Sequence, residues 1–103
     1  MKIAVKRTGG YAGLSEDVAA TDTEKISKKA ASQVQRIVQK MGFFNLPDKV
    51  TGSSVGADLF YYEITVTDGN RQHTVGFYLD DDPETSSLRQ LVDTVVKLPL
   101  SRR

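Results

Sequence analysis

The sequence contains few side chains of the types that catalysis or metal binding requires. His73 is the only histidine, and cysteine is absent. A histidine-rich metal cage, a Cys-His dyad and a thiolate metal site are therefore excluded. A lone histidine close to a turn is typically a partly exposed strand residue. Because no set of acid, base and nucleophile can be assembled, we expect a protein that is not an enzyme and that needs no cofactor or metal.

Two further clusters resemble ligand sites only weakly. The run Asp80 to Asp82 offers three hard carboxylate ligands, but its spacing lacks the alternation of a calcium-binding loop, and helix capping explains it more simply. Gly9, Gly10 and Gly13 resemble part of a phosphate loop, but no Lys-Ser/Thr pair follows them and they do not lead directly into a helix. We expect no nucleotide to bind there.

Charge and hydropathy argue against nucleic acid and membrane as partners. The net charge is +1, from 14 basic and 13 acidic side chains, so no overall field attracts a polyanion. Tyr61 and Tyr78 could stack on bases, but cross-strand packing is the simpler interpretation. No stretch is long and apolar enough for a signal peptide or a membrane span. We expect a soluble, cytoplasmic protein, and export by a route without a cleaved signal stays open.

The stretch from Leu59 to Leu79 is the element around which the chain is organised. Apolar side chains alternate with polar ones along both of its arms, as in half-buried strands. Between the arms lies Asp68-Gly69-Asn70, a strong signal for a tight hairpin turn. Either two-residue turn places Tyr62 and Ile64 on the face that carries Val75 and Phe77.

Two short strands and two helices are expected to cover this hairpin. Lys2 to Arg7 predicts a strand with Ile3 and Val5 on its buried face, and a second strand is expected around Val18 and Ala20. Thr21 to Glu24 matches a capping box that opens the first helix, whose apolar stripe comprises Ile26, Ala30, Val34, Ile37 and Met41. Its basic face carries Lys25, Lys29, Arg36 and Lys40.

The rest of the chain completes the predicted fold. Gly42 is expected to end the first helix, with Phe43 making the accompanying apolar contact, and residues 48–58 to form a surface loop. Asp82 and Pro83 are expected to start a second helix that ends near Lys97. The stripe of that helix comprises Leu88, Leu91, Val92 and Val95. At 103 residues this predicts a single α+β domain over residues 1–103, with order ββαββα and two helices on one face of a mostly antiparallel four-stranded sheet.

One loop carries large apolar side chains that no periodicity assigns to the core. Tyr11 and Leu14 lie among glycines between the first two strands. Apolar side chains on a loop held by a rigid hairpin are suited to contact another protein. The alternative is that both side chains fold back over the edge of the sheet.

Several segments together resemble the emfourin family, which comprises small bacterial protein inhibitors of protealysin-like metallopeptidases of the thermolysin class. The resemblance covers nearly the whole chain in order, through the segments MKIAVKRTGGYAGL, GFFNLP, GADLFYYEITVTDGNRQHTV and PETSSLRQLVDTV. It implies an α+β inhibitor that binds the mature enzyme and blocks its active site.

The resemblance gives the loops a specific expected role. The first candidate for contact with an M4-type metallopeptidase comprises Gly10, Tyr11, Ala12, Gly13 and Leu14. The second candidate loop comprises Ser54, Gly56 and Asp58, where Asp58 could reach a metal or a cationic group, although hairpin entry and solubility also explain that composition. We expect a monomer. The alternative function is a non-catalytic binding module or adaptor without inhibitory activity.

Overall fold

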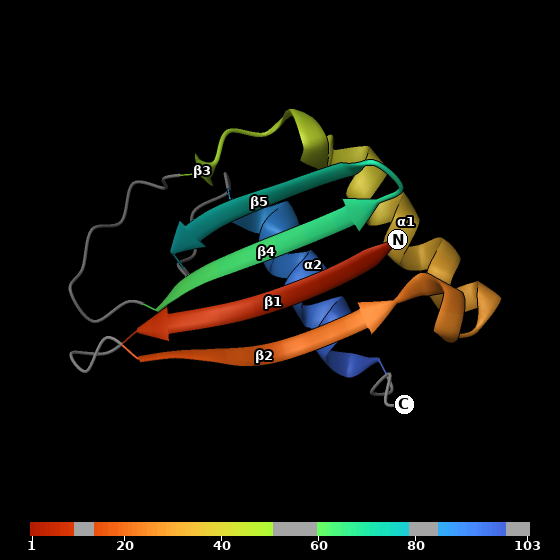
Figure 1. Cartoon of the computed structure of the whole chain (residues 1–103), viewed down its shortest axis with the longest axis horizontal. Helices are drawn as coiled ribbons and strands as arrows, with labels where there is room; N and C mark the ends of the chain where they lie inside the picture. Colours follow the sequence, from red (N-terminus) through yellow and green to blue (C-terminus); the bar gives the residue numbers. More distant parts are fainter. Residues whose placement is uncertain (10–13, 51–59, 79–84, 99–103) are drawn as a thin grey trace.

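The computed structural model describes residues 1–9, 14–50, 60–78 and 85–98. These residues form a five-stranded mixed sheet with two helices on one face (Figure 1). The order of strands across the sheet is β2-β1-β4-β5-β3. The strands are β1 (Lys2–Gly9), β2 (Leu14–Asp22), β3 (Lys49–Val50), β4 (Tyr61–Asp68) and β5 (Arg71–Tyr78). The helices are α1 (Lys28–Met41) and α2 (Ser86–Lys97), and the 3-10 turns are η1 (Thr23–Lys25) and η2 (Phe43–Asn45). The α+β class and the two helices are confirmed.

The central hairpin of β4 and β5 forms as the alternation predicts. Gly69 has a φ of 63°, so a residue without a Cβ occupies the left-handed position of the turn. The resulting register places Tyr62 opposite Phe77 and Ile64 opposite Val75. All four side chains are buried, which confirms the predicted core face.

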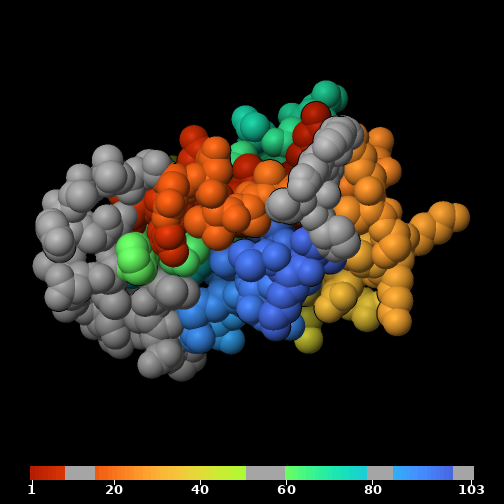
Figure 2. Space-filling model, turned by 90° about the horizontal axis from the view of Figure 1, so that it is seen from below, coloured from red at the N-terminus to blue at the C-terminus, as the bar shows by residue number. Residues whose placement is uncertain are grey.

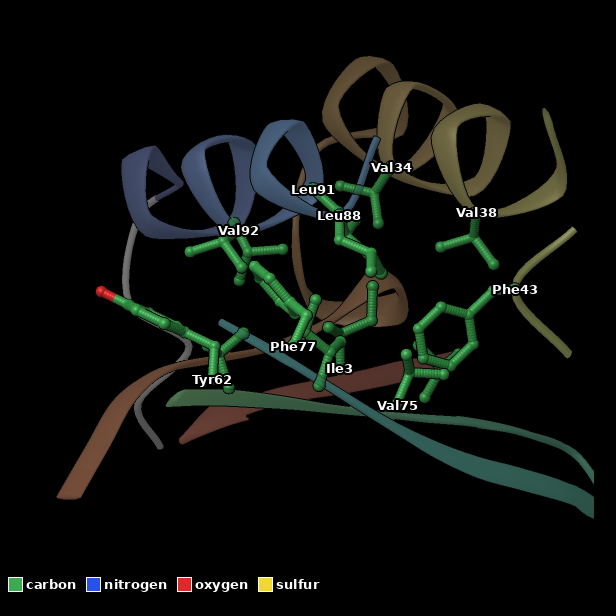
Figure 3. Packing of buried hydrophobic residues seen from close by; sticks show 14 residues of the cluster. Ile3, Val34, Val38, Phe43, Tyr62, Val75, Phe77, Leu88, Leu91 and Val92 are labelled. Carbon is green, nitrogen blue, oxygen red and sulfur yellow. The ribbon is translucent and has the colours of Figure 1, made fainter. Parts of the chain in front are cut away.

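The core lies between this face of the sheet and the two helices (Figure 3). From α2 it receives the predicted stripe, which is buried throughout: Leu88, Leu91, Val92 and Val95. From α1 the buried residues are Val34 and Val38, while Ile37 and Met41 pack only partly against the core. The prediction therefore missed Val38. Opposite this stripe Lys29, Arg36 and Lys40 are exposed, as expected.

The predicted start of the first helix is wrong. Thr21 is paired with Ile3 as part of β2, and its buried hydroxyl has no hydrogen-bond partner among the described residues. The chain stays extended because β1 supplies backbone partners, and the Thr23 N–H donates to the carbonyl of Met1 at 2.9 Å. Helix α1 begins only at Lys28, where the Ser27 hydroxyl accepts a hydrogen bond from the Ala30 N–H at 3.1 Å.

The predicted four-stranded sheet of order ββαββα is also corrected. Lys49 and Val50, assigned to the loop of residues 48–58, form β3 and lie parallel to Gly76 and Phe77 of β5. The Gly76 N–H donates to the Asp48 carbonyl at 2.8 Å. Residues 49 and 50 become a strand because the edge of β5 offers backbone partners, although the local sequence favours a loop. The added parallel strand makes the sheet five-stranded and mixed.

The connection that leads into β3 is held against the core. Gly42 ends α1 with a φ of 65°, and Phe43 is buried, as predicted. The His73 Nε2 donates to the carbonyl of Leu46 at 2.7 Å, and its ring meets Phe43 edge to face at 5.8 Å. His73 is half-buried in β5, which confirms its expected structural place.

Candidate partner-binding surface

The two predicted contact loops lie largely outside the described residues. Gly10, Tyr11, Ala12 and Gly13 are outside, and Leu14 is the first residue of β2, paired with Gly9 of β1. Ser54, Gly56 and Asp58 of the second candidate are outside as well. What the structure describes is the framework from which both segments leave.

The described residues that flank the two segments lie at the same end of the sheet. Gly9 and Leu14 are the described neighbours of the first segment, and Phe60 is the described neighbour of the second. In the pairing of β1 with β4, Thr8 lies opposite Tyr61, so these neighbours meet across adjacent strands (Figure 1). We call this end of the sheet, bounded by Gly9, Leu14 and Phe60, the loop end.

Towards the loop end, the side chains on the core-facing side of β4, and of Phe60 just before it, become more exposed because the helices no longer cover them. The exposed fraction of these side chains is 0% at Val66 and Ile64, 8% at Tyr62 and 40% at Phe60. Tyr62 is still held by a stacked contact with Phe77 at 5.7 Å, and its hydroxyl points away from the labelled core side chains (Figure 3). Helix α2 (blue) lies beside the start of β4 (green) in Figure 2. An aromatic ring therefore remains partly open to solvent where the helical cover ends.

Two charged side chains accompany this ring. The Arg7 guanidinium lies over the Phe60 ring, 4.7 Å from its centroid, and forms an ion pair with the Glu16 carboxylate. Arg7 follows Ile3 and Val5 on the core-facing row of β1 and lies opposite both Tyr62 and Glu16 in the register. Arg7, Glu16 and Phe60, here called the Phe60 cluster, therefore join β1, β2 and the entry to β4.

The opposite face of the sheet carries a second aromatic group near the same end. Tyr61 and Tyr78 meet edge to face at 5.1 Å, which confirms the predicted cross-strand packing. The Lys49 ammonium lies 5.4 Å from the centroid of each ring. Partial burial raises the pKa of the Tyr61 phenol above its ordinary value of 10.0, and the nearby charge of Glu63 and the Tyr78 phenol raise it further. Tyr61, Tyr78 and Lys49 thus pack together on the face of the hairpin opposite the core.

The described part of the chain shows no cluster of metal-ligating side chains. Within residues 1–9, 14–50, 60–78 and 85–98, no three histidine or carboxylate side chains lie together so that they could hold a metal ion. Over the same ranges no helix is long and apolar enough to cross a membrane. The chemistry available at the loop end is that of recognition, through an aromatic ring, an ion pair and two flanking chain segments.

An open aromatic ring at one end of the sheet of a small α+β domain is suited to the recognition of another protein. The family model that matches the chain is that of emfourin, over residues 5–96. The chain therefore belongs to the emfourin family, which confirms the resemblance seen in its segments. Searches of curated proteins and of solved structures find no match. The family is consistent with a protein inhibitor of metallopeptidases and implies a protein partner.

The Phe60 cluster was not predicted from the sequence. The alternation along the hairpin places Phe60 on the same parity as Tyr62 and Ile64, but no exposure was predicted there. One signal was present: Arg7 occupies the same parity as Ile3 and Val5, and an arginine at a core-facing position indicates that the cover ends before it.

Proposed function

We propose that this protein inhibits a thermolysin-like or protealysin-like zinc metallopeptidase of the M4 type by blocking its active site. The observation that carries the proposal is membership of the emfourin family over residues 5–96. The arrangement of the loop end supports it, because the described residues that flank segments 10–13 and 51–59 lie there.

The framework meets the physical requirements of a tight protein inhibitor. Association costs conformational entropy, so a contact surface mounted on a rigid sheet loses less on binding than one on a flexible chain. At the loop end, β2 pairs with β1 from Lys6 to Gly9, beyond a register shift between Val5 and Lys6, and β1 pairs with β4 as far as Thr8. Interfaces of this kind bury on the order of 800 Å² per partner, around a few anchor side chains.

Within this proposal the two segments have different roles. Tyr11 and Leu14 supply the apolar side chains for the hydrophobic specificity pocket of the enzyme. Asp58 of the second segment supplies a carboxylate for the catalytic metal or for a cationic group beside it. Together the two segments would cover the substrate cleft without offering a bond for cleavage.

A competition experiment tests the proposed mode of action. The purified enzyme is assayed with a fluorogenic peptide at several concentrations of this protein, with and without a small zinc-binding inhibitor that occupies the active site. Mutually exclusive binding is expected, so that the small inhibitor raises the apparent inhibition constant of the protein. Inhibition that is indifferent to the small inhibitor would place the protein elsewhere on the enzyme. If it binds without inhibiting at all, the protein is a non-inhibitory binding module.

A further inference from the structure

We propose that Phe60 is an apolar anchor of the inhibitory surface, and that Arg7 is the positioning residue that holds its ring in place. The expected partner site is an apolar pocket on the surface of the metallopeptidase, next to the cleft. This inference rests on the proposed function and adds to it a contact residue that lies outside both predicted loops.

The exposure of Phe60 is the first argument. Among the residues that the structure describes, the exposed large hydrophobic side chains are Phe60, at 40%, and Val96, at 49%. Val96 lies on the outer side of α2, remote in sequence from both predicted loops. Phe60 is directly adjacent in sequence to segment 51–59. It precedes β4, which pairs with β1, the strand that leads into segment 10–13. Its position therefore makes it continuous with the proposed interface, which is not the case for Val96.

The type of side chain is the second argument. An aromatic ring supplies a large contact area with only two rotatable bonds, so its immobilisation costs little entropy for the area that it buries. Aromatic anchors accordingly dominate the binding energy of many interfaces, whereas valine is under-represented among them. The open part of the Phe60 ring is thus suited to enter a pocket.

The Phe60 cluster provides the third argument, because it fixes the ring before the partner arrives. The Arg7 guanidinium lies 4.7 Å from the ring centroid and is itself held by Glu16 on the neighbouring strand. Arg7 also lies opposite Tyr62, whose ring is stacked on Phe77 in the core. Through Arg7 the ring is therefore linked to β1 and to Glu16 of β2, and a ring held in this way loses less conformational freedom on binding.

The arrangement also has a simpler interpretation, in which Arg7 only shields an apolar ring from water. In that case loss of the ring changes stability but not inhibition. The two interpretations differ in whether the loss of the ring weakens inhibition. The inhibition constant and the melting temperature must therefore be recorded for the same variants.

The test measures the inhibition constant of the full-length protein against the metallopeptidase for matched variants. Phe60→Ala is expected to raise the inhibition constant by roughly tenfold or more, while Val96→Ala, which truncates an exposed apolar side chain on α2, leaves it unchanged. Phe60→Glu provides a second variant without the ring. It is expected to fold, since the new carboxylate can pair with Arg7. Because a charge cannot enter an apolar pocket without a partner, this variant is expected to inhibit at least as weakly as Phe60→Ala.

The role of Arg7 is tested by a double-mutant cycle. Arg7→Gln is expected to weaken inhibition severalfold in the wild-type background and to have no further effect in Phe60→Ala, because its contribution acts through the ring. Arg7→Lys, which keeps a cation, should restore part of the loss. Equal and additive effects in both backgrounds would remove the positioning role.

The outcomes separate this inference from the proposed function. Tight inhibition by wild-type protein, Phe60→Ala and Phe60→Glu alike would overturn the anchor and leave the proposed function intact. Weakened inhibition by both Phe60 variants, with Val96→Ala at the wild-type value, would establish the anchor. Complete lack of inhibition by the folded wild-type protein would overturn both.

Discussion

The hydroxyl end of the Tyr61 ring occupies the space that a Cβ atom at Gly76 would need. The two residues lie diagonally across β4 and β5, since Glu63 is the direct partner of Gly76 and Tyr78 that of Tyr61. Glycine at this position allows the ring to lie close against the backbone of β5 while its edge meets Tyr78. The absence of a side chain at Gly76 thus makes room for the ring of Tyr61.

This relationship predicts that the effect of Gly76→Ala changes sign with the residue at position 61. In the wild-type protein the substitution displaces the Tyr61 ring and disrupts its contact with Tyr78, so the free energy of unfolding should fall by about 0.5–1.5 kcal/mol. In a Tyr61→Ala background the space is free, and alanine should stabilise the strand by about 0.5–1 kcal/mol relative to glycine. Urea unfolding of the four proteins measures both effects; equal destabilisation in both backgrounds would refute the steric relationship.

The raised pKa of Tyr61 predicts a specific loss of stability at alkaline pH. Burial, Glu63 and Tyr78 hold the proton on the phenol in the folded protein, whereas the unfolded chain releases it near pH 10.0. The unfolded state therefore binds fewer protons above that pH, and the free energy of unfolding contributed by this group falls as pH rises through the folded pKa. Tyr61→Phe should remove this part of the decline. Parallel unfolding curves for both proteins across this range would show that Tyr61 does not contribute.

The end of α1 provides a test of backbone conformation alone. Gly42 has a φ of 65°, and no atom lies within 4 Å of a Cβ built there. Gly42→Ala should therefore destabilise the protein by roughly 1–2 kcal/mol, because a residue with a Cβ is strained in the left-handed conformation. No clash with neighbouring atoms contributes. Gly42→Asn should cost less, because asparagine adopts this conformation more readily. Thermal unfolding of the two variants gives the order, and an alanine variant as stable as wild type would contradict the assignment.

Truncation of Tyr11 and Leu14 tests the first predicted loop. The double substitution to alanine is expected to weaken inhibition by roughly tenfold or more, because apolar anchors carry much of the binding energy. The melting temperature should change little if the side chains serve the partner. Unchanged inhibition with a lower melting temperature would instead support the alternative, in which they fold back over the sheet. Val96→Ala serves again as the matched surface control.

The elements with strong local patterns could be predicted from the sequence. The β4-β5 hairpin combines period-two alternation with a glycine turn, and the stripe of α2 is buried residue for residue. Gly42 and Phe43 also behave as predicted, since a helix stop depends on neighbouring residues alone. In each case local preference and tertiary packing favour the same structure.

The predictions that failed depend on partners distant in the sequence. Thr21 resembles a helix cap but stays in β2, because pairing with Ile3 of β1 stabilises an extended backbone there. The two residues of β3 become a strand only because β5 has a free edge beside them. The exposure of Phe60 depends on where α2 stops covering the sheet, which the residues around Phe60 do not specify. Its pairing with Arg7 likewise follows from the register between β1 and β4.

Inhibition is tested most directly by titrating a purified M4-type metallopeptidase, taken from the same genome, with this protein. Peptidase activity is followed with a fluorogenic peptide, and the folded state of the protein is verified by its thermal unfolding. Activity is expected to fall in proportion to the added protein and to disappear near one equivalent. Full activity in the presence of a large excess of folded protein would contradict the proposed function.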